Sequence, residues 1–158
     1  MSEPKYTVIA AQSFAEIEPE FMERVTKAIW CSVTTIDRYN RPRTRVLHPI
    51  WEGATGWINT WRHSGKSKHL AHNPYVALAY LSDFIKPLYV HAMAEWVDDP
   101  TEKKRIWELC KATPEPYGFD PANPFISHDN SEYGLLRLTP WQIEMDTLGV
   151  GTKVLLKP

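Results

Sequence analysis

Residues 43–78, RTRVLHPIWEGATGWINTWRHSGKSKHLAHNPYVAL, decide the fold because they combine strand and helix signals in a fixed order. Residues 43–52 follow an extended pattern, and a glycine-containing turn leads into a second strand at 57–61. Residues 64–72 predict a short helix, which ends before a proline because that position is pushed out of the helical region. A strand returns at 76–82, so the stretch predicts a strand-rich architecture with one helix between strands.

The flanking sequence adds further strands. β-branched residues favour a strand over 30–36, and the turn residues at 37–42 make it the first half of a hairpin. Strand-like sequence also covers 88–97 and 135–148, the latter bent at Pro140. About six or seven short strands result, with helices placed before, between and after them. This order excludes a doubly wound sheet and favours a small antiparallel barrel.

Helix signals stand on both sides of the central stretch. An amphipathic helix is predicted over 19–28, where Pro19 suits the first turn because its missing N–H needs no partner there. Ser13 and Glu16 match a capping box, but a helix that starts there would hold Pro19 in its interior, where proline breaks helices. The Asp-Asp-Pro sequence at 98–100 is a second strong helix start.

Two segments carry no clear period. The first dozen residues form an arm or a short edge strand. Residues 111–133 hold four prolines, and an irregular segment of this length inside a compact domain is functional or packs against a partner chain.

The composition indicates one globular domain that spans residues 1–158. Of the 158 residues, 43% are apolar, which is enough for a hydrophobic core. No apolar run approaches the roughly 20 residues of a membrane span, and the first residues lack the order of a signal peptide, so we expect a cytoplasmic protein with no membrane partner. Cys31 and Cys110 lie far apart, which argues against a disulfide framework and against a metal site.

The charge is unevenly distributed. Residues 38–69 contain seven basic residues and one acidic residue, although the net charge is −1 and the pI is near 6.6. Proteins that coat nucleic acid usually have a high pI, so binding of nucleic acid through the basic turn at 38–45 ranks last among the possible functions. A local anion site fits better.

Basic and hydroxyl side chains gather around the start of the helix predicted at 64–72. Arg45 lies on a strand, Thr60 ends the next strand, and Ser64 and Lys66 open the helix. A helix N-terminus presents unpaired N–H groups and a positive dipole end, so this arrangement predicts a phosphate site. The alternative is that Lys66 is a solvated surface residue and Arg45 pairs with a carboxylate, and charge counting alone favours it.

Three segments in this region carry a family resemblance. Residues 43–47 (RTRVL), 57–60 (WINT) and 64–78 (SGKSKHLAHNPYVAL) resemble, in order and spacing, the flavin-binding core of the pyridoxamine 5′-phosphate oxidase-like split-barrel family. The resemblance covers residues 28–95 well and extends more loosely through the last strand. It implies a mainly β, six- to seven-stranded antiparallel split β-barrel with flanking helices.

The resemblance also implies a homodimer with flavin mononucleotide (FMN) in a cleft between the subunits. Arg45 and Lys66 would hold the phosphate, and Ser64 and Thr60 would bond to it or to the ribityl chain. Further contacts come from the opposite subunit, near residues 86–89. The cofactor-binding residues that the resemblance implies are Arg45, Val46, Leu47, Asn59, Thr60, Ser64 and Lys66.

The implied activity is hydride transfer between the flavin N5 atom and a small, flat substrate, in which the cofactor supplies most of the chemistry and no catalytic residue is demanded. Ile50 and Gly65 stand where the family's founding enzyme has basic residues, and residues 135–141 lack its arginine-x-histidine pair. These departures argue against oxidation of pyridoxamine phosphate itself. His48 is a candidate proton donor or ring contact. Tryptophans that would either wall the substrate pocket or pack in the core are Trp51, Trp61, Trp96 and Trp141.

Two alternatives stay open from the sequence. Related members of the family bind the deazaflavin coenzyme F-420, and Arg62 and Lys68 would suit its longer anionic tail. Other members bind flavin or haem as stress-response carriers without turnover. The spectrum and mass of the bound cofactor distinguish these possibilities.

Overall fold

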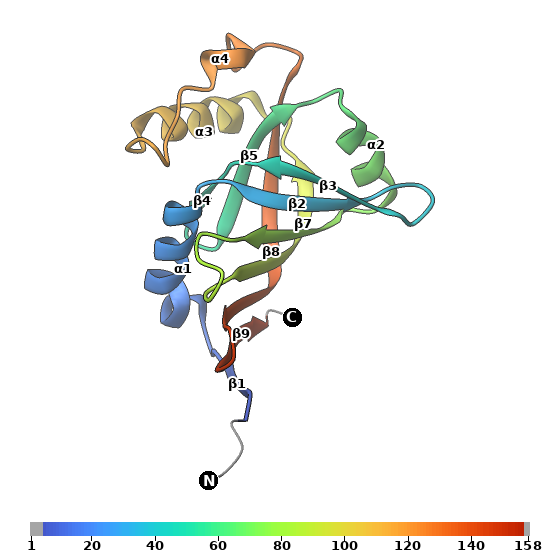
Figure 1. Ribbon diagram of the computed structural model, residues 1–158. Helices are drawn as coiled ribbons and strands as arrows, with labels where there is room; N and C mark the ends of the chain where they lie inside the picture. The colour runs from blue at the N-terminus through green and yellow to red at the C-terminus, as the bar shows by residue number, and fades with distance from the viewer. Residues whose placement is uncertain (1–4, 157–158) are drawn as a thin grey trace.

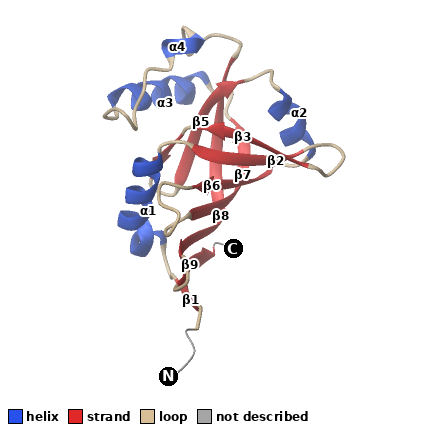
Figure 2. Cartoon of the chain, in the orientation of Figure 1, coloured by secondary structure: helices blue, strands red, loops and turns tan. Residues whose placement is uncertain are grey.

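The computed structural model describes residues 5–156 and shows a strongly bent sheet with helices packed around it (Figure 1). The strands of this part of the chain are β1 (Thr7–Ala10), β2 (Cys31–Ile36), β3 (Pro42–Leu47), β4 (Pro49–Glu52), β5 (Thr55–Trp61), β6 (Tyr75–Tyr80), β7 (Leu88–Trp96), β8 (Tyr133–Thr147) and β9 (Gly151–Leu156). The helices are α1 (Phe14–Ala28), α2 (Gly65–His72), α3 (Pro100–Ala112) and α4 (Ala122–Phe125). Figure 2 shows that the strands form the centre of the molecule and the helices its outside.

The strands pair in the order β1-β9-β8-β7-β6-β2-β3, and β5 joins this path by pairing with both β4 and β8. The long strand β8 is shared, because residues 133–138 pair with β5 and residues 142–147 pair with β9. All pairs are antiparallel except β1 with β9. The sheet does not close, so the predicted mainly β split barrel with flanking helices is confirmed.

Alternate side chains of the strands fill the barrel interior, and buried hydrogen bonds connect some of them. Along β2 the buried positions alternate with half-buried ones, as one inward-facing side requires. The Trp51 indole N–H donates to the Tyr80 hydroxyl at 2.8 Å, and the Trp51 backbone N–H donates to the Tyr117 hydroxyl at 2.7 Å. The second bond ties the irregular segment after α3 to the barrel wall.

Helix α1 corrects one prediction from the sequence. It begins at Phe14, so Pro19 lies inside the helix rather than in its first turn. Ser13 is the N-cap but makes no side-chain cap bond, while the Glu16 carboxylate accepts the Gln12 backbone N–H at 3.1 Å. The extra turn persists because it buries Ile17, which is 1% exposed, against the core.

Two other helices begin where the sequence predicts. Ser64 is the N-cap of α2, and Asp99 caps α3 by accepting the Thr101 N–H at 2.9 Å. The described residues form more strands than the sequence predicted, because β1 and β9 are short and the chain between β3 and β4 is interrupted at His48.

The segment at 111–133 contains the short helix α4, and it lies with α3 at the end of the barrel away from β1 and β9 (Figure 1). Within residues 5–156, no helix is long and apolar enough to cross a membrane. The same residues place no three His, Cys, Asp or Glu side chains together as a metal site.

Candidate functional site

Arg45 is a partly buried cation on the edge strand β3. Its guanidinium donates to the Thr35 hydroxyl on the neighbouring strand β2 at 2.9 Å. No ion pair within residues 5–156 includes Arg45, so the alternative in which it pairs with a carboxylate is wrong. Burial lowers the pKa of Arg45, and the nearby charge of Arg43 lowers it further.

Lys66 lies in the first turn of α2 and is only 8% exposed. It is therefore not a solvated surface residue. Burial lowers its pKa, and the positive charge of Arg45 lowers it further, which means that the two cations lie close enough to repel each other. A buried cation and a partly buried one, close together and without a carboxylate, are costly unless an anion joins them.

The N-terminus of α2 adds neutral donors to this pair of cations. The Ser64 hydroxyl is buried and has no hydrogen-bond partner in the described part of the chain. A Cβ at Gly65 would meet no other atom within 4 Å, so the first turn is open on that side. Free N–H groups, an unpaired hydroxyl and two cations are the chemistry of a phosphate site.

The remaining basic side chains of this region are already paired or exposed. Arg41 and Arg43 lie 3.0 and 3.8 Å from the Asp37 carboxylate, and Arg62 lies 3.5 Å from that of Asp98. Lys68 is exposed on α2. Arg45 and Lys66 are therefore distinguished from these neighbours because they are at least partly buried and form no ion pair within residues 5–156.

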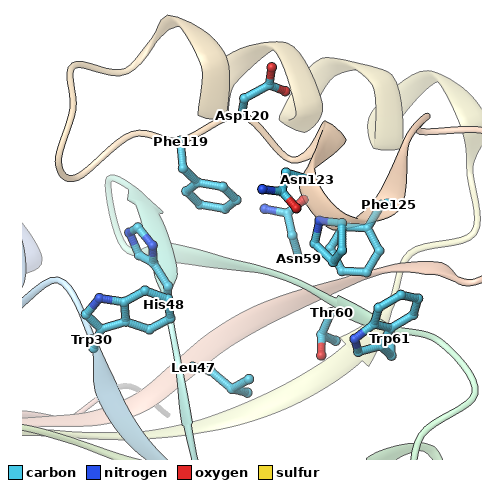
Figure 3. Close-up of a pocket in the computed structure, with 11 residues that line it drawn as sticks. Trp30, Leu47, His48, Asn59, Thr60, Trp61, Phe119, Asp120, Asn123 and Phe125 are labelled. Atoms are coloured by element: carbon cyan, nitrogen blue, oxygen red, sulfur yellow. The ribbon is translucent and has the colours of Figure 1, made fainter.

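A cavity of about 560 Å³ lies beside Arg45 and Lys66, and residues of β3 and β5 form part of its wall. Figure 3 shows it between the segment that carries Phe119 and Asn123 above and the strands that carry Leu47 and Thr60 below. Its lining is mainly aromatic and apolar, as sites for flat ligands are. The lining residues are Trp30, Leu47, His48, Asn59, Thr60, Trp61, Phe119, Asp120, Asn123, Pro124 and Phe125.

His48 is the histidine of this cavity. Its ring lies 5.0 Å from that of Trp30 and 4.7 Å from that of Phe119, and its Nε2 atom is buried without a partner. Burial lowers the pKa of His48, so the ring is neutral near pH 7. A neutral ring with an unpaired nitrogen suits a hydrogen bond to a ligand better than donation of a proton.

The seven residues implied by the resemblance fall into three groups. Arg45, Ser64 and Lys66 surround the start of α2, and Leu47, Asn59 and Thr60 line the cavity. Val46 is 65% exposed. Arg45 and Leu47 share one face of β3 because strand residues two apart point the same way, which makes the two ends of the site continuous.

Both polar atoms of the Asn59 side chain form hydrogen bonds within the protein. Its carbonyl oxygen accepts the Tyr133 hydroxyl at 2.5 Å, and its amide nitrogen donates to the Cys110 sulfur at 3.2 Å. This residue therefore shapes the cavity wall while its side-chain bonds are used within the barrel and α3.

Several site residues were not found by sequence reasoning. Of the four tryptophans considered, Trp61 lines the cavity, whereas Trp51 packs in the core against Tyr80. Trp30 and Phe119 were missed, although the length of the 111–133 segment was a signal that it contributes to function.

Solved structures with this fold come from several bacteria. A Clostridium acetobutylicum protein related to general stress protein 26 of B. subtilis has a TM-score of 0.72 at 15% identity and covers 89% of this chain and 94% of its own. A Nostoc punctiforme protein described as pyridoxamine 5′-phosphate oxidase-related and FMN-binding has a TM-score of 0.64 at 14% identity, with 87% of each chain covered. An F-420 reductase has a TM-score of 0.58 at 17% identity and covers 77% of this chain and 93% of its own.

At such low sequence identities, the structural similarity shows a shared fold. No curated protein matches the chain. The family model described as pyridoxamine 5′-phosphate oxidase matches residues 17–145, which is most of the sequence. The chain therefore belongs to the pyridoxamine 5′-phosphate oxidase family.

Proposed function

We propose that this protein is an FMN-dependent oxidoreductase that works as a homodimer on a small, flat substrate. The observation that carries the proposal is a pair of cations, the buried Lys66 and the partly buried Arg45, which form no ion pair within residues 5–156 and lie near a helix N-terminus beside an aromatic cavity. A ligand with a phosphate at one end and a flat ring at the other satisfies both halves of this site. The FMN-binding relative from Nostoc punctiforme supports the choice of ligand.

Each part of the site has a role in binding. Arg45 and Lys66 neutralise the phosphate, and the buried Ser64 hydroxyl donates a hydrogen bond to it or to the ribityl chain. Leu47 and the aromatic side chains of the cavity exclude water from the ring and orient it. When bound, the flavin supplies hydride transfer at its N5 atom.

The homodimer is part of the proposal because large apolar side chains are exposed around the site. Trp30 is 58% exposed, Val46 is 65% exposed and Trp61 is 45% exposed. A second copy of the chain that covers these side chains would complete the wall of the cavity. The resemblance places contacts from this second copy near residues 86–89.

Oxidation of pyridoxamine phosphate is not the proposed reaction. Arg137, the arginine of the 135–141 segment on β8, lies 3.1 Å from the Glu95 carboxylate and is paired with it. It is therefore already neutralised, and the substrate is better sought among flat molecules that need no second phosphate site.

A deazaflavin-dependent reductase is the second candidate. A basic groove of about 250 Å³ adjoins the cation pair, and the side chains that line it are Asp37, Arg38, Tyr39, Arg41, Arg43, Lys68 and His69. An anionic tail that extends beyond the phosphate would lie along this groove, and the F-420 reductase with the same fold supports this candidate. Arg62 is directed away from this groove toward Asp98 and Trp96.

The first experiment identifies the cofactor and tests the phosphate site together. The purified protein is mixed with FMN or with the deazaflavin coenzyme, unbound ligand is removed, and absorbance and mass report what is retained. We expect stoichiometric FMN in the wild type and none in the Arg45→Ala/Lys66→Ala double variant, with the fold intact by circular dichroism. For FMN retention, Lys68→Ala is the matched control, because Lys68 is exposed two residues along the same helix and lines the groove assigned to the deazaflavin tail.

Each outcome has a meaning. Retention of the deazaflavin alone would select the second candidate. Retention of neither ligand would demote the oxidoreductase proposal and make haem the next ligand to try. Full retention of FMN in the double variant would show that the phosphate site is misplaced.

A further inference from the structure

Three side chains from different elements form a continuous hydrogen-bonded chain behind the phosphate site. The Thr35 hydroxyl oxygen accepts the Arg45 guanidinium N–H at 2.9 Å and lies 2.9 Å from Nδ1 of His69. Thr35 is 2% exposed, so water does not compete for these bonds. The packing of α2 against β2 gives His69 this inner contact.

The protons of this chain have a defined arrangement when no anion is present. Arginine can only donate, so the Thr35 oxygen is the acceptor for Arg45. The Thr35 proton is then free to point to Nδ1 of His69 at 2.9 Å rather than to the more distant Arg43 carbonyl at 3.4 Å. In this arrangement Nδ1 of His69 is an acceptor and the ring is neutral.

His69 also lies in the electric field of the phosphate site. Burial lowers its pKa, the charges of Arg45, Arg43 and Lys66 lower it further, and the charge of Asp37 raises it. The charged and titratable groups that face His69 come from the β2–β3 turn, from β3 and from α2. They are Asp37, Arg38, Tyr39, Arg41, Arg43, Arg45, Lys66 and Lys68.

We propose that Thr35 and His69 are positioning residues for Arg45, and that His69 takes up a proton from solvent when a phosphate group binds between Arg45 and Lys66. The inference rests on the proposed phosphate site. A bound dianion cancels the positive potential that, together with burial, disfavours a charged His69 ring. The protonated Nδ1 then donates to Thr35, whose hydroxyl still accepts from Arg45 and turns its own proton to the Arg43 carbonyl.

The first test measures FMN affinity against pH, between about pH 5.5 and 8, by quenching of flavin fluorescence. The phosphate of FMN itself titrates near pH 6 and affects every variant equally. Relative to His69→Gln, we expect the wild type to lose affinity as pH rises, by up to about tenfold per pH unit. The control is His72→Gln, an exposed histidine of the same helix that lies 3.2 Å from Asn40, and it should follow the wild type.

The second test separates positioning from packing at Thr35. Thr35→Val keeps the shape of the side chain and removes the hydroxyl, so it should weaken FMN binding about tenfold and leave riboflavin, which has no phosphate, unchanged. Thr35→Ser restores the hydroxyl and should restore FMN affinity. Parallel pH profiles for the wild type and His69→Gln would overturn the proton uptake, and equal FMN affinity in Thr35→Val would overturn the positioning role.

A direct titration of His69 by NMR distinguishes failure of this inference from failure of the proposed function. Inorganic phosphate alone should raise the pKa of His69 in the wild type but not in the Arg45→Ala/Lys66→Ala variant. A rise with phosphate and no FMN binding would keep the anion site and reject FMN. FMN binding without any rise would reject only the role of His69, and no response to either ligand would reject both.

Discussion

The Asp37 carboxylate binds residues of the turn and strand that follow it, between β2 and β3, beside the candidate site. Its oxygens accept the backbone N–H groups of Tyr39 and Arg41 at 2.9 and 3.0 Å, and the Arg41 side chain at 3.0 Å. Burial alone would raise the pKa of Asp37, but these hydrogen bonds outweigh it and lower the pKa to about 2. Arg41 and Arg43 are thereby paired with a carboxylate, which Arg45 is not.

This depressed pKa predicts a pH-dependent stability. Because the pKa of Asp37 is lower in the folded chain than its ordinary 3.8, its contribution is present above about pH 4 and is lost as pH falls toward 2. Asp37→Asn should therefore unfold at a lower temperature than the wild type above pH 4, and the two curves should converge below it. Thermal unfolding followed by circular dichroism at several pH values measures this, and a constant gap down to pH 2 would contradict it.

Some residues of the candidate site could be predicted from the sequence, and others could not. Arg45, Ser64 and Lys66 were predicted because the sequence places Ser64 and Lys66 at a helix start and the family resemblance assigns all three to a phosphate site, and the structure brings them together. Thr35 and His69 were not predicted as partners, because their contact depends on the packing of α2 against β2, which no local pattern encodes. Burial of Lys66 likewise follows from packing.

Helices followed their local signals except where packing outweighed them. Asp99 and Pro100 begin α3 as predicted, since a cap and a proline in the first turn act locally. Pro19 does not stand in the first turn of α1 as predicted, because the turn before it buries Ile17 and packs Phe14 edge-on against Phe21, with ring centroids 5.3 Å apart. Local sequence signals therefore predicted the start of α3 correctly, and they failed at the start of α1, where packing against the core outweighs them.

The cap of α3 gives a prediction for stability. Asp99→Ala removes the bond to the Thr101 N–H and should lower the free energy of unfolding by about 1 kcal/mol. Asp98→Ala is the matched control, because Asp98 makes only an exposed contact of 3.5 Å with Arg62 and should change stability by less than about 0.5 kcal/mol. Urea denaturation measures both, and equal effects would refute the role of the cap.

At the scale of the molecule, the sequence predicted the class of fold but not how the sheet ends. Strands β2 and β7, on either side of residues 43–78, were recognisable because each buries one face in an alternating pattern. The first dozen residues were predicted as an arm or a short edge strand, and β1 is a short edge strand exposed at all four positions. β9 was not predicted, because its burial pattern lacks the alternation that identifies a half-buried strand. The segment at 111–133 could not be placed, because its contacts are to distant strands, such as Tyr117 with Trp51.

The proposed homodimer predicts that cofactor and quaternary structure are lost together. Light scattering at high concentration should give about twice the chain mass of 18.3 kDa. Dilution through the monomer–dimer transition should release FMN in proportion to dimer lost, because each site needs side chains from both copies. A monomer that keeps full cofactor would contradict the shared site, and riboflavin in place of FMN controls for the phosphate contacts.

The parallel pairing of β1 with β9 has a mechanical consequence. Thr7 lies opposite Gly151 and Ala10 opposite Val154, so the first and last strands of the described chain run in the same direction side by side. A pulling force applied to the two ends of the polypeptide would drag these strands past each other along their length. The hydrogen bonds between them would then be loaded in shear and all at once, rather than opened one after another like a zipper. These two short strands would therefore bear an applied tension before the barrel and its site do.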